Sequence, residues 1–154
     1  MRIPDTARPT MDDFLDLVRG TTPAEAAVLL GPESWTLGDI VGHLIDSASN
    51  NHQPFVRLQF GVLEGFPGYD AEPWVTAQSY AEADWTTLVL LWESYNELLL
   101  HVIETIPETA LRNTWNTPDG PKTLEFLVTD YYAHMRPHVE HYATRLAEVR
   151  ANGN

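Results

Sequence analysis

The stretch TLEFLVTDYYAHMRPHVEHYATRL, residues 123–146, decides the fold and carries the most informative side chains. Its apolar residues recur in steps of three and four, which predicts one long amphipathic helix over about 123–150. The expected buried stripe consists of Leu124, Val128, Tyr131, Met135, His138, Tyr142 and Leu146. Three of the six histidines of the protein, His134, His138 and His141, lie in this helix at spacings of four and three residues. These spacings place the imidazole rings on one helical face, so they can converge on one point.

Two further helices are expected from their caps and their periodicity. Thr36 is the expected N-cap of the first, and Asp39 three residues later can close a capping box. Its buried stripe is predicted to contain Leu37, Ile40, Val41, Leu44, Ile45 and Ala48, and His43 lies at the edge of that stripe. The other helix is expected to begin at Asp84 and to end before Pro107. Its stripe consists of Leu88, Trp92, Tyr95, Leu99, Val102 and Ile106.

The remaining segments are less regular. A short helix is expected over residues 11–18, followed by a helical turn with Thr22 as cap and Pro23 at its first position. Residues 61–83 show neither a helical nor a strand period, and they are predicted to form a long loop that either walls a pocket or packs on the bundle. The connector before the last helix is rich in turn formers, with a tight turn at Asp119–Gly120, and it leads to Thr123 as the expected cap of that helix.

Four helical segments without an alternating strand pattern predict an all-α fold. We expect a four-helix bundle with a long loop between its second and third helices. At 154 residues with 44% hydrophobic content, the chain is expected to form one domain, residues 1–154. No stretch approaches the roughly 18 apolar residues of a membrane span, and the start, MRIPDTARPT, lacks the apolar core of a signal peptide. A cytoplasmic protein is therefore expected.

The composition restricts the chemistry that the protein can perform. Without cysteine there is no disulfide, no thiolate zinc site and no cysteine nucleophile, so a metal ion would need imidazole and oxygen ligands. The 22 acidic and nine basic residues give a net charge of −13, which repels phosphate backbones. Neither nucleic acid nor a membrane is therefore an expected partner.

Two histidines four residues apart on a helix, such as His134 and His138, are a known pair of divalent-ion ligands. Such pairs also arise by chance, and a site needs a third ligand from another helix. His43 is the best candidate for that ligand, and the alternative is a core histidine that donates to a backbone carbonyl. Pro137 lies within the last helix and cannot donate to the carbonyl of Ala133, so it either aims the two histidines by a kink or is a tolerated bend. The spacing alone leaves these alternatives open.

Two segments resemble the DinB-like superfamily of four-helix metal-binding proteins: WTLGDIVGHLIDSASNNHQPFVRLQ, residues 35–59, and TLEFLVTDYYAHMRPHVEHYATRL, residues 123–146. The segment PGYDAEPWVTAQSYAEADWTTLVLLWESYN, residues 67–96, resembles a branch of it. The resemblance implies a four-helix bundle in which His43, His134 and His138 hold a divalent metal ion and leave coordination positions to water. Some relatives are transferases of low-molecular-weight thiols such as bacillithiol or mycothiol, and others are described as metal-dependent hydrolases.

Three histidines with open coordination positions are typical of a catalytic site, where a divalent ion such as Zn²⁺ or Ni²⁺ lowers the pKa of water or of a thiol. We therefore expect an enzyme that acts on a small molecule, by hydrolysis or by transfer of a low-molecular-weight thiol. The alternative is a bundle that binds metal, or serves in sensing or a stress response, without turnover. The sequence is compatible with a homodimer and does not decide the oligomeric state.

Helical spacing nominates further residues near this site. Asp46 and Asn50 share the side of the helix on which His43 lies. Asp46 is a candidate for orienting an imidazole ring or for acting as a base, and Asn50 is a candidate for binding water or substrate. Arg57 and Arg136 are candidates for holding a substrate carboxylate. Ordinary caps, surface charges and salt bridges are the alternatives for all four.

The remaining histidines are expected outside the ligand set. His141 lies one turn beyond the pair and is expected to have a supporting or structural role. His52 and His101 are expected at the surface. Because an imidazole must be neutral to bind metal, metal affinity is expected to fall below a pH of about 6.5.

Overall fold

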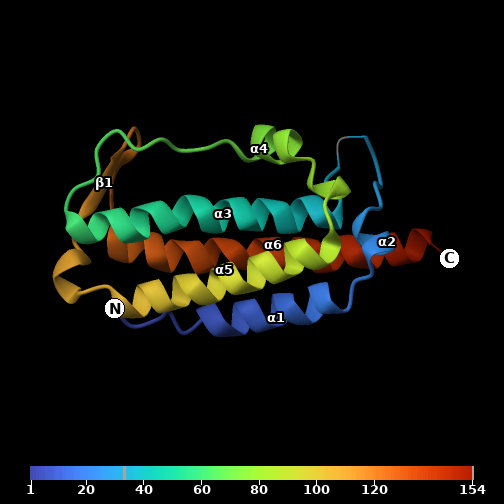
Figure 1. Ribbon diagram of the computed structural model, residues 1–154, viewed down its shortest axis with the longest axis horizontal. Coiled ribbons are helices and arrows are strands. Elements are labelled where there is room, and N and C mark those ends of the chain that lie inside the picture. The colour runs from blue at the N-terminus through green and yellow to red at the C-terminus, as the bar shows by residue number, and fades with distance from the viewer. Residues whose placement is uncertain (33, 154) are drawn as a thin grey trace.

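A computed structural model describes residues 1–32 and 34–153 and confirms the all-α four-helix bundle (Figure 1). Its four main helices are α1 (Ala7–Arg19), α3 (Leu37–Arg57), α5 (Trp85–Thr105) and α6 (Leu124–Asn152). The shorter elements are the helices α2 (Pro23–Ala26) and α4 (Ala71–Gln78), the 3₁₀ turns η1 (Leu58–Phe60), η2 (Tyr80–Glu82) and η3 (Glu108–Ala110), and the strands β1 (Thr114–Thr117) and β2 (Gly120–Thr123). Among the described residues, no helix combines the length and the apolar character that crossing a membrane requires.

The helix starts follow from the predicted caps. The Thr36 hydroxyl accepts a hydrogen bond from the Asp39 backbone N–H, and the Asp39 carboxylate accepts one from the Thr36 backbone N–H. Thr22 forms a second capping box at the start of α2. Asp84 and Thr123 cap α5 and α6, and each side chain accepts from a backbone N–H of the first turn. These caps satisfy N–H groups that have no partner within the helix, which fixes where each helix begins.

The long connection between α3 and α5 follows from the topology. In Figure 1 the chain enters α3 and α5 at the same end of the bundle, so these two helices run parallel, while α1 and α6 run the opposite way. α3 packs against both α5 and α6, and α1 packs against the same two helices, α5 and α6, from the other side. A helix of 21 residues spans about 31 Å, so the chain needs a long crossover to return to the start of α5. Residues 61–83, called the return segment here, make that crossover along α3.

The return segment is more structured than the predicted loop. It contains the helix α4 and the turn η2, and both pack against α3. Val75 is the only residue of α4 that is buried, so the segment has almost no apolar stripe for periodicity to detect. Ser79 separates the two elements in a left-handed conformation, with φ 49° and ψ 49°.

Three smaller expectations are corrected. The turn predicted at Asp119–Gly120 lies at Pro118–Asp119, and it closes a two-stranded antiparallel hairpin of β1 and β2, whose four-residue strands are too short to show an alternating pattern. α1 begins at Ala7, four residues before its predicted start. Pro54 predicts a kink or a break in this helix, with continuation through the segment PFVRLQF as the alternative; α3 does continue through Pro54, because a proline removes only one backbone hydrogen bond and Pro54 itself is buried.

The core lies where the four main helices face one another. Phe14 of α1 packs edge-on against Trp92 of α5 and Tyr142 of α6, with ring centroids 4.7 and 5.1 Å apart. On α6, Val139 occupies the core position that the sequence assigned to His138. His138 is half-buried at the edge of the stripe, which leaves its ring free to face α3.

Candidate metal centre

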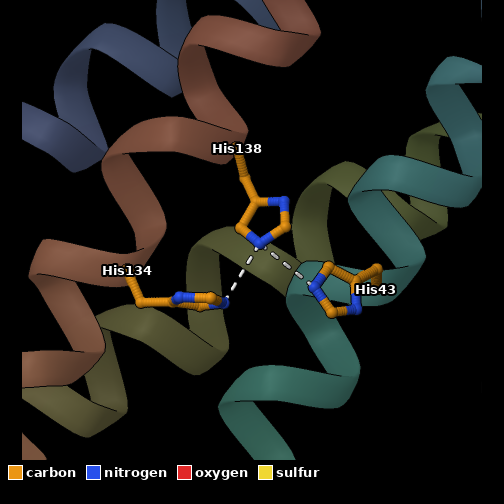
Figure 2. A group of neighbouring side chains, drawn as sticks. All are labelled: His43, His134 and His138. Atoms are coloured by element: carbon orange, nitrogen blue, oxygen red, sulfur yellow. Dashed lines mark hydrogen bonds between the residues drawn. The ribbon is translucent and has the colours of Figure 1, made fainter. Parts of the chain in front are cut away.

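Three imidazole rings from two helices converge on one point between α3 and α6 (Figure 2). The Nε2 atoms of His43 and His138 are 3.3 Å apart, and those of His138 and His134 are 3.2 Å apart. All three candidate ligand atoms lie within 4.8 Å of one another. His43 is 95 residues from His138 in the chain, so the tertiary fold, and not local spacing, brings it to the pair.

The helices account for this placement. His134 and His138 lie one turn apart on α6, so their rings follow one another along one face. His43 lies in the second turn of α3, on a helix that packs directly against α6. His43 is buried, His138 is half-buried and His134 is exposed. The cluster therefore reaches from the interior of the bundle to solvent.

The cluster fits a divalent metal ion. Two nitrogen ligands of one zinc ion, at about 2.0–2.1 Å and a tetrahedral angle, lie about 3.3 Å apart. The two Nε2 separations on either side of His138, 3.3 and 3.2 Å, match that value. Hydrogen bonding alone does not satisfy the group, because Nε2 of His138 faces two other ring nitrogens and carries either one N–H or one lone pair, which can pair with only one of them. A cation shared by three lone pairs satisfies all three nitrogens at once.

The electrostatics keep two of the rings neutral. Burial, together with the nearby rings of His43, His134 and His141, lowers the pKa of His138 to about 4. Burial also lowers the pKa of His43, although the Asp46 carboxylate opposes that effect. A neutral imidazole keeps the lone pair that a metal ion needs. Protons are therefore expected to compete with a metal ion for these two residues only at pH values below the reference histidine pKa of about 6.5.

Asp46 lies next to the cluster and is only 3% exposed. Its Oδ1 atom accepts hydrogen bonds from the hydroxyl of Tyr80, at 2.7 Å, and from the side-chain amide of Gln78, at 2.8 Å. Its Oδ2 atom has no hydrogen-bond partner among residues 1–32 and 34–153. Asn50, half-buried one turn further along α3, donates from its side-chain amide to the Asp46 backbone carbonyl at 2.9 Å.

The two candidate arginines lie away from the cluster. Arg57 is 14 residues after His43 on the same helix, which separates them by about 21 Å along the axis. Its guanidinium lies over the ring of Phe66, at 5.6 Å from the centroid. Arg136 points to α1, where its Nη1 atom forms an ion pair with Asp13 at 2.6 Å. The structure therefore places neither guanidinium beside the three imidazoles.

The other histidines lie outside the cluster. His141 and His101 are exposed. His52, which was expected at the surface, is half-buried and its Nδ1 atom lies 3.2 Å from the hydroxyl of Tyr95. The difference arises because Tyr95 of α5 covers that side of α3.

Sequence reasoning missed three residues that surround the site. The ring of Trp35 packs against that of His43, with centroids 5.1 Å apart. Gln78 and Tyr80 reach Asp46 from the return segment. No motif marks them, because their contacts depend on the path of a segment without periodicity. The capping box at Thr36 was the nearest available signal, since it fixes where Trp35 enters α3.

Comparison with known proteins agrees with this architecture. A family model described as the DinB superfamily matches residues 8–142. The structure resembles that of YfiT from Bacillus subtilis, with a TM-score of 0.77 and 19% identity, covering 96% of this chain and 84% of that one. YfiT is described as a probable metal-dependent hydrolase with an unusual four-helix bundle topology, and at this identity the likeness shows the fold alone. No curated protein matches the chain. Because the family model covers most of its length, the chain belongs to the DinB superfamily.

Proposed function

We propose that this protein is a metal-dependent enzyme that hydrolyses a small molecule at a divalent ion, zinc or nickel, held by His43, His134 and His138. The observation that carries the proposal is the convergence of one ring nitrogen from each of three imidazoles, on two helices, within 4.8 Å. A divalent ion bound there supplies the chemistry, because it lowers the pKa of water or of a thiol and polarises a carbonyl group.

The arrangement of the chain favours a catalytic site over a closed structural one. Three protein ligands leave at least one coordination position for water or substrate, whereas structural zinc sites use four protein ligands. The graded burial of the cluster, from His43 inside to His134 at the surface, gives a small molecule access from one side. The buried side holds the ligands in place, since His43 is 5% exposed.

Hydrolysis is the preferred reaction, and thiol transfer is the second candidate. The similarity to YfiT, which is described as a probable metal-dependent hydrolase, supports hydrolysis. The resemblance to a superfamily that includes transferases of low-molecular-weight thiols supports the second. A thiol transferase needs a low-molecular-weight thiol as cosubstrate, because the chain itself contains no cysteine. This requirement separates the two reactions by experiment.

The test uses metal-loaded wild-type protein, His138→Ala and His101→Ala. His101 is an exposed histidine of α5 outside the cluster, so His101→Ala controls for the loss of any imidazole. Each protein is incubated with a panel of activated esters without thiol, and with chlorodinitrobenzene and a panel of small thiols. We expect ester cleavage without thiol in the wild type and in His101→Ala, and its loss in His138→Ala.

Three other results would change the proposal. Turnover that requires a thiol and is lost in His138→Ala would replace hydrolysis by thiol transfer. If metal is bound and the turnover of the wild type does not exceed that of His138→Ala in either panel, the proposal of an enzyme would be replaced by that of a metal-binding or sensing bundle. Equal metal content in the wild type and in His138→Ala would place the metal elsewhere.

A further inference from the structure

Two buried polar atoms beside the cluster lack hydrogen-bond partners among the described residues. One is Nδ1 of His43, and the other is Oδ2 of Asp46. Both residues lie on α3, three positions apart, so their side chains project from the same side of the helix. A buried polar group without a partner is costly, and such groups are few in folded proteins. Two of them on neighbouring turns therefore require an explanation.

The chemistry of the His43 ring makes its Nδ1 atom a donor. Its Nε2 atom faces the cluster, 3.3 Å from Nε2 of His138 (Figure 2). A neutral imidazole that offers the lone pair of Nε2 carries its proton on Nδ1. That N–H group needs an acceptor, and Asp46 Oδ2 is an acceptor without a donor.

The return segment holds Asp46 in a defined orientation. Tyr80 and Gln78 donate to the same oxygen, Oδ1, and leave Oδ2 as the free acceptor of the carboxylate. Burial and the adjacent Asp46 carboxylate raise the pKa of Tyr80 well above its ordinary value, so its hydroxyl remains a donor at neutral pH. Ser79, between the two donors, has a left-handed conformation that is uncommon for residues other than glycine. This sharp turn allows both neighbours to reach one oxygen.

α3 has a matching adaptation for the Tyr80 ring. A Cβ atom on Gly42 would lie 2.0 Å from a carbon of that ring, so only glycine leaves room for it. The ring therefore rests on the backbone of α3 at the residue next to His43. Its hydroxyl reaches Asp46 one turn further along the same helix.

We infer that Asp46 is a positioning residue for His43: when the metal ion is bound, Asp46 Oδ2 accepts a hydrogen bond from His43 Nδ1–H, a bond that the two atoms do not form here, and Tyr80 and Gln78 hold Asp46 in that role. The inference rests on the proposed metal site and adds two supporting side chains, Tyr80 and Gln78, from the return segment outside the four main helices. A carboxylate that accepts from the second nitrogen of a ligand imidazole fixes the tautomer and the ring orientation and makes the ligand more basic. The return segment thereby sets the metal affinity of residues on α3 and α6.

The experiment measures zinc affinity by competition with a chelator, and it compares Tyr80→Phe with Tyr131→Phe. Tyr80→Phe keeps the ring on Gly42 and removes only the hydroxyl. Tyr131→Phe removes a hydroxyl that donates to Asn96 at the same distance, 2.7 Å, but has no contact with Asp46. We expect Tyr80→Phe to weaken zinc binding about tenfold or more, and Tyr131→Phe to leave it unchanged.

Two further readouts separate positioning from general damage. In the Asp46→Ala background, Tyr80→Phe should have no additional effect on zinc affinity, because the hydroxyl acts through Asp46. In zinc-loaded wild-type protein, ¹H–¹⁵N NMR of the imidazole rings should show the His43 proton on Nδ1, protected from exchange. That protection should be lost in Asp46→Ala.

The outcomes distinguish this inference from the proposed function. Equal zinc affinity in Tyr80→Phe and Tyr131→Phe, or additive effects of Tyr80→Phe and Asp46→Ala, would overturn the positioning role while leaving the metal site intact. Equal zinc affinity in the wild type and in His43→Ala would overturn the three-histidine site, and the positioning role with it.

Discussion

The helix α6 and the return segment both reach the three-histidine cluster, and they do so by different physical means. α6 is a 29-residue helix whose regular period places His134 and His138 on one face. The return segment has one short helix with a single buried residue, and it reaches the cluster through two side-chain hydrogen bonds to Asp46. The first region provides candidate ligands, and the second holds Asp46 beside a candidate ligand on a third element, α3. The positions of candidate ligands and the residues that support them can therefore come from segments with unlike sequence signals.

The largest expected effect comes from α6. His134→Ala or His138→Ala removes a ligand outright, so zinc affinity should fall by more than about 100-fold, beyond the range expected for supporting residues. His141→Ala is the matched control, since it removes an exposed imidazole from the same helix outside the cluster. Isothermal titration of the three variants makes the comparison. Wild-type affinity in the His134→Ala, His138→Ala double variant would remove α6 from the site.

The next effect comes from the return segment. Gly42→Ala places a methyl group where the Tyr80 ring lies, so the ring and η2 must move away from Asp46. We expect the unfolding free energy to fall by about 1–3 kcal/mol, a loss that outweighs the gain of about 1 kcal/mol in helix propensity from glycine to alanine. We also expect zinc affinity to become roughly tenfold weaker. Gly68→Ala is the control within the return segment, because its Cβ would meet nothing within 4 Å. Urea denaturation and zinc titration report the two quantities, and identical behaviour of both variants would contradict the seating of Tyr80 on α3.

A third prediction concerns pH and the metal-free protein. The pKa of His138 is lowered to about 4 in the folded state, whereas an unfolded histidine titrates near about 6.5. Between these values the unfolded chain binds more protons, so stability is complete above about pH 6.5 and is lost as the pH falls toward about 4. Because the ring is partly exposed, we expect a loss of about 1–2 kcal/mol. Denaturation of the wild type and of His138→Ala across this range measures it, and equal slopes with pH would refute the assignment.

The smallest effect is expected at the outer face of α6. Arg136→Gln breaks an exposed ion pair with Asp13 and should lower the unfolding free energy by less than about 1 kcal/mol. Because the guanidinium points to α1, zinc affinity and the KM for any substrate found should not change. A raised KM with normal stability would instead restore Arg136 as a substrate-binding residue.

Much of this architecture was predictable because it depends on local chemistry. The caps at Thr36, Asp84 and Thr123 act within one turn of the chain, and the sequence identified each of them. The pairing of His134 with His138 follows from helical spacing, whereas the approach of His43 depends on how α3 packs against α6. That approach was expected from the resemblance to the DinB-like superfamily and from the position of His43 at the edge of its apolar stripe. The spacing of the histidines alone left it open.

The unpredicted parts depend on tertiary structure or on very short elements. Gln78 and Tyr80 lie in a segment without periodicity, and their shared acceptor is more than 30 residues away in the chain. The β hairpin has strands of four residues, which is too few for an alternating pattern to be recognised. His138 was assigned to the core because its spacing matched the stripe, but Val139 takes that place and His138 turns to the edge. A shift of one residue on α6 therefore separates a core side chain from a candidate metal ligand.

We propose that one divalent ion links α3 to α6 through His43, and such a link predicts a large rise in melting temperature when zinc is added. A ligand at 100 times its dissociation constant stabilises a folded protein by about 2.7 kcal/mol, which corresponds to roughly 5–10 °C for a domain of this size. At the free zinc concentration that gives this shift in the wild type, His43→Ala should shift far less, because only the pair on α6 remains. Equal zinc-induced shifts in the two proteins would contradict a site shared between the helices.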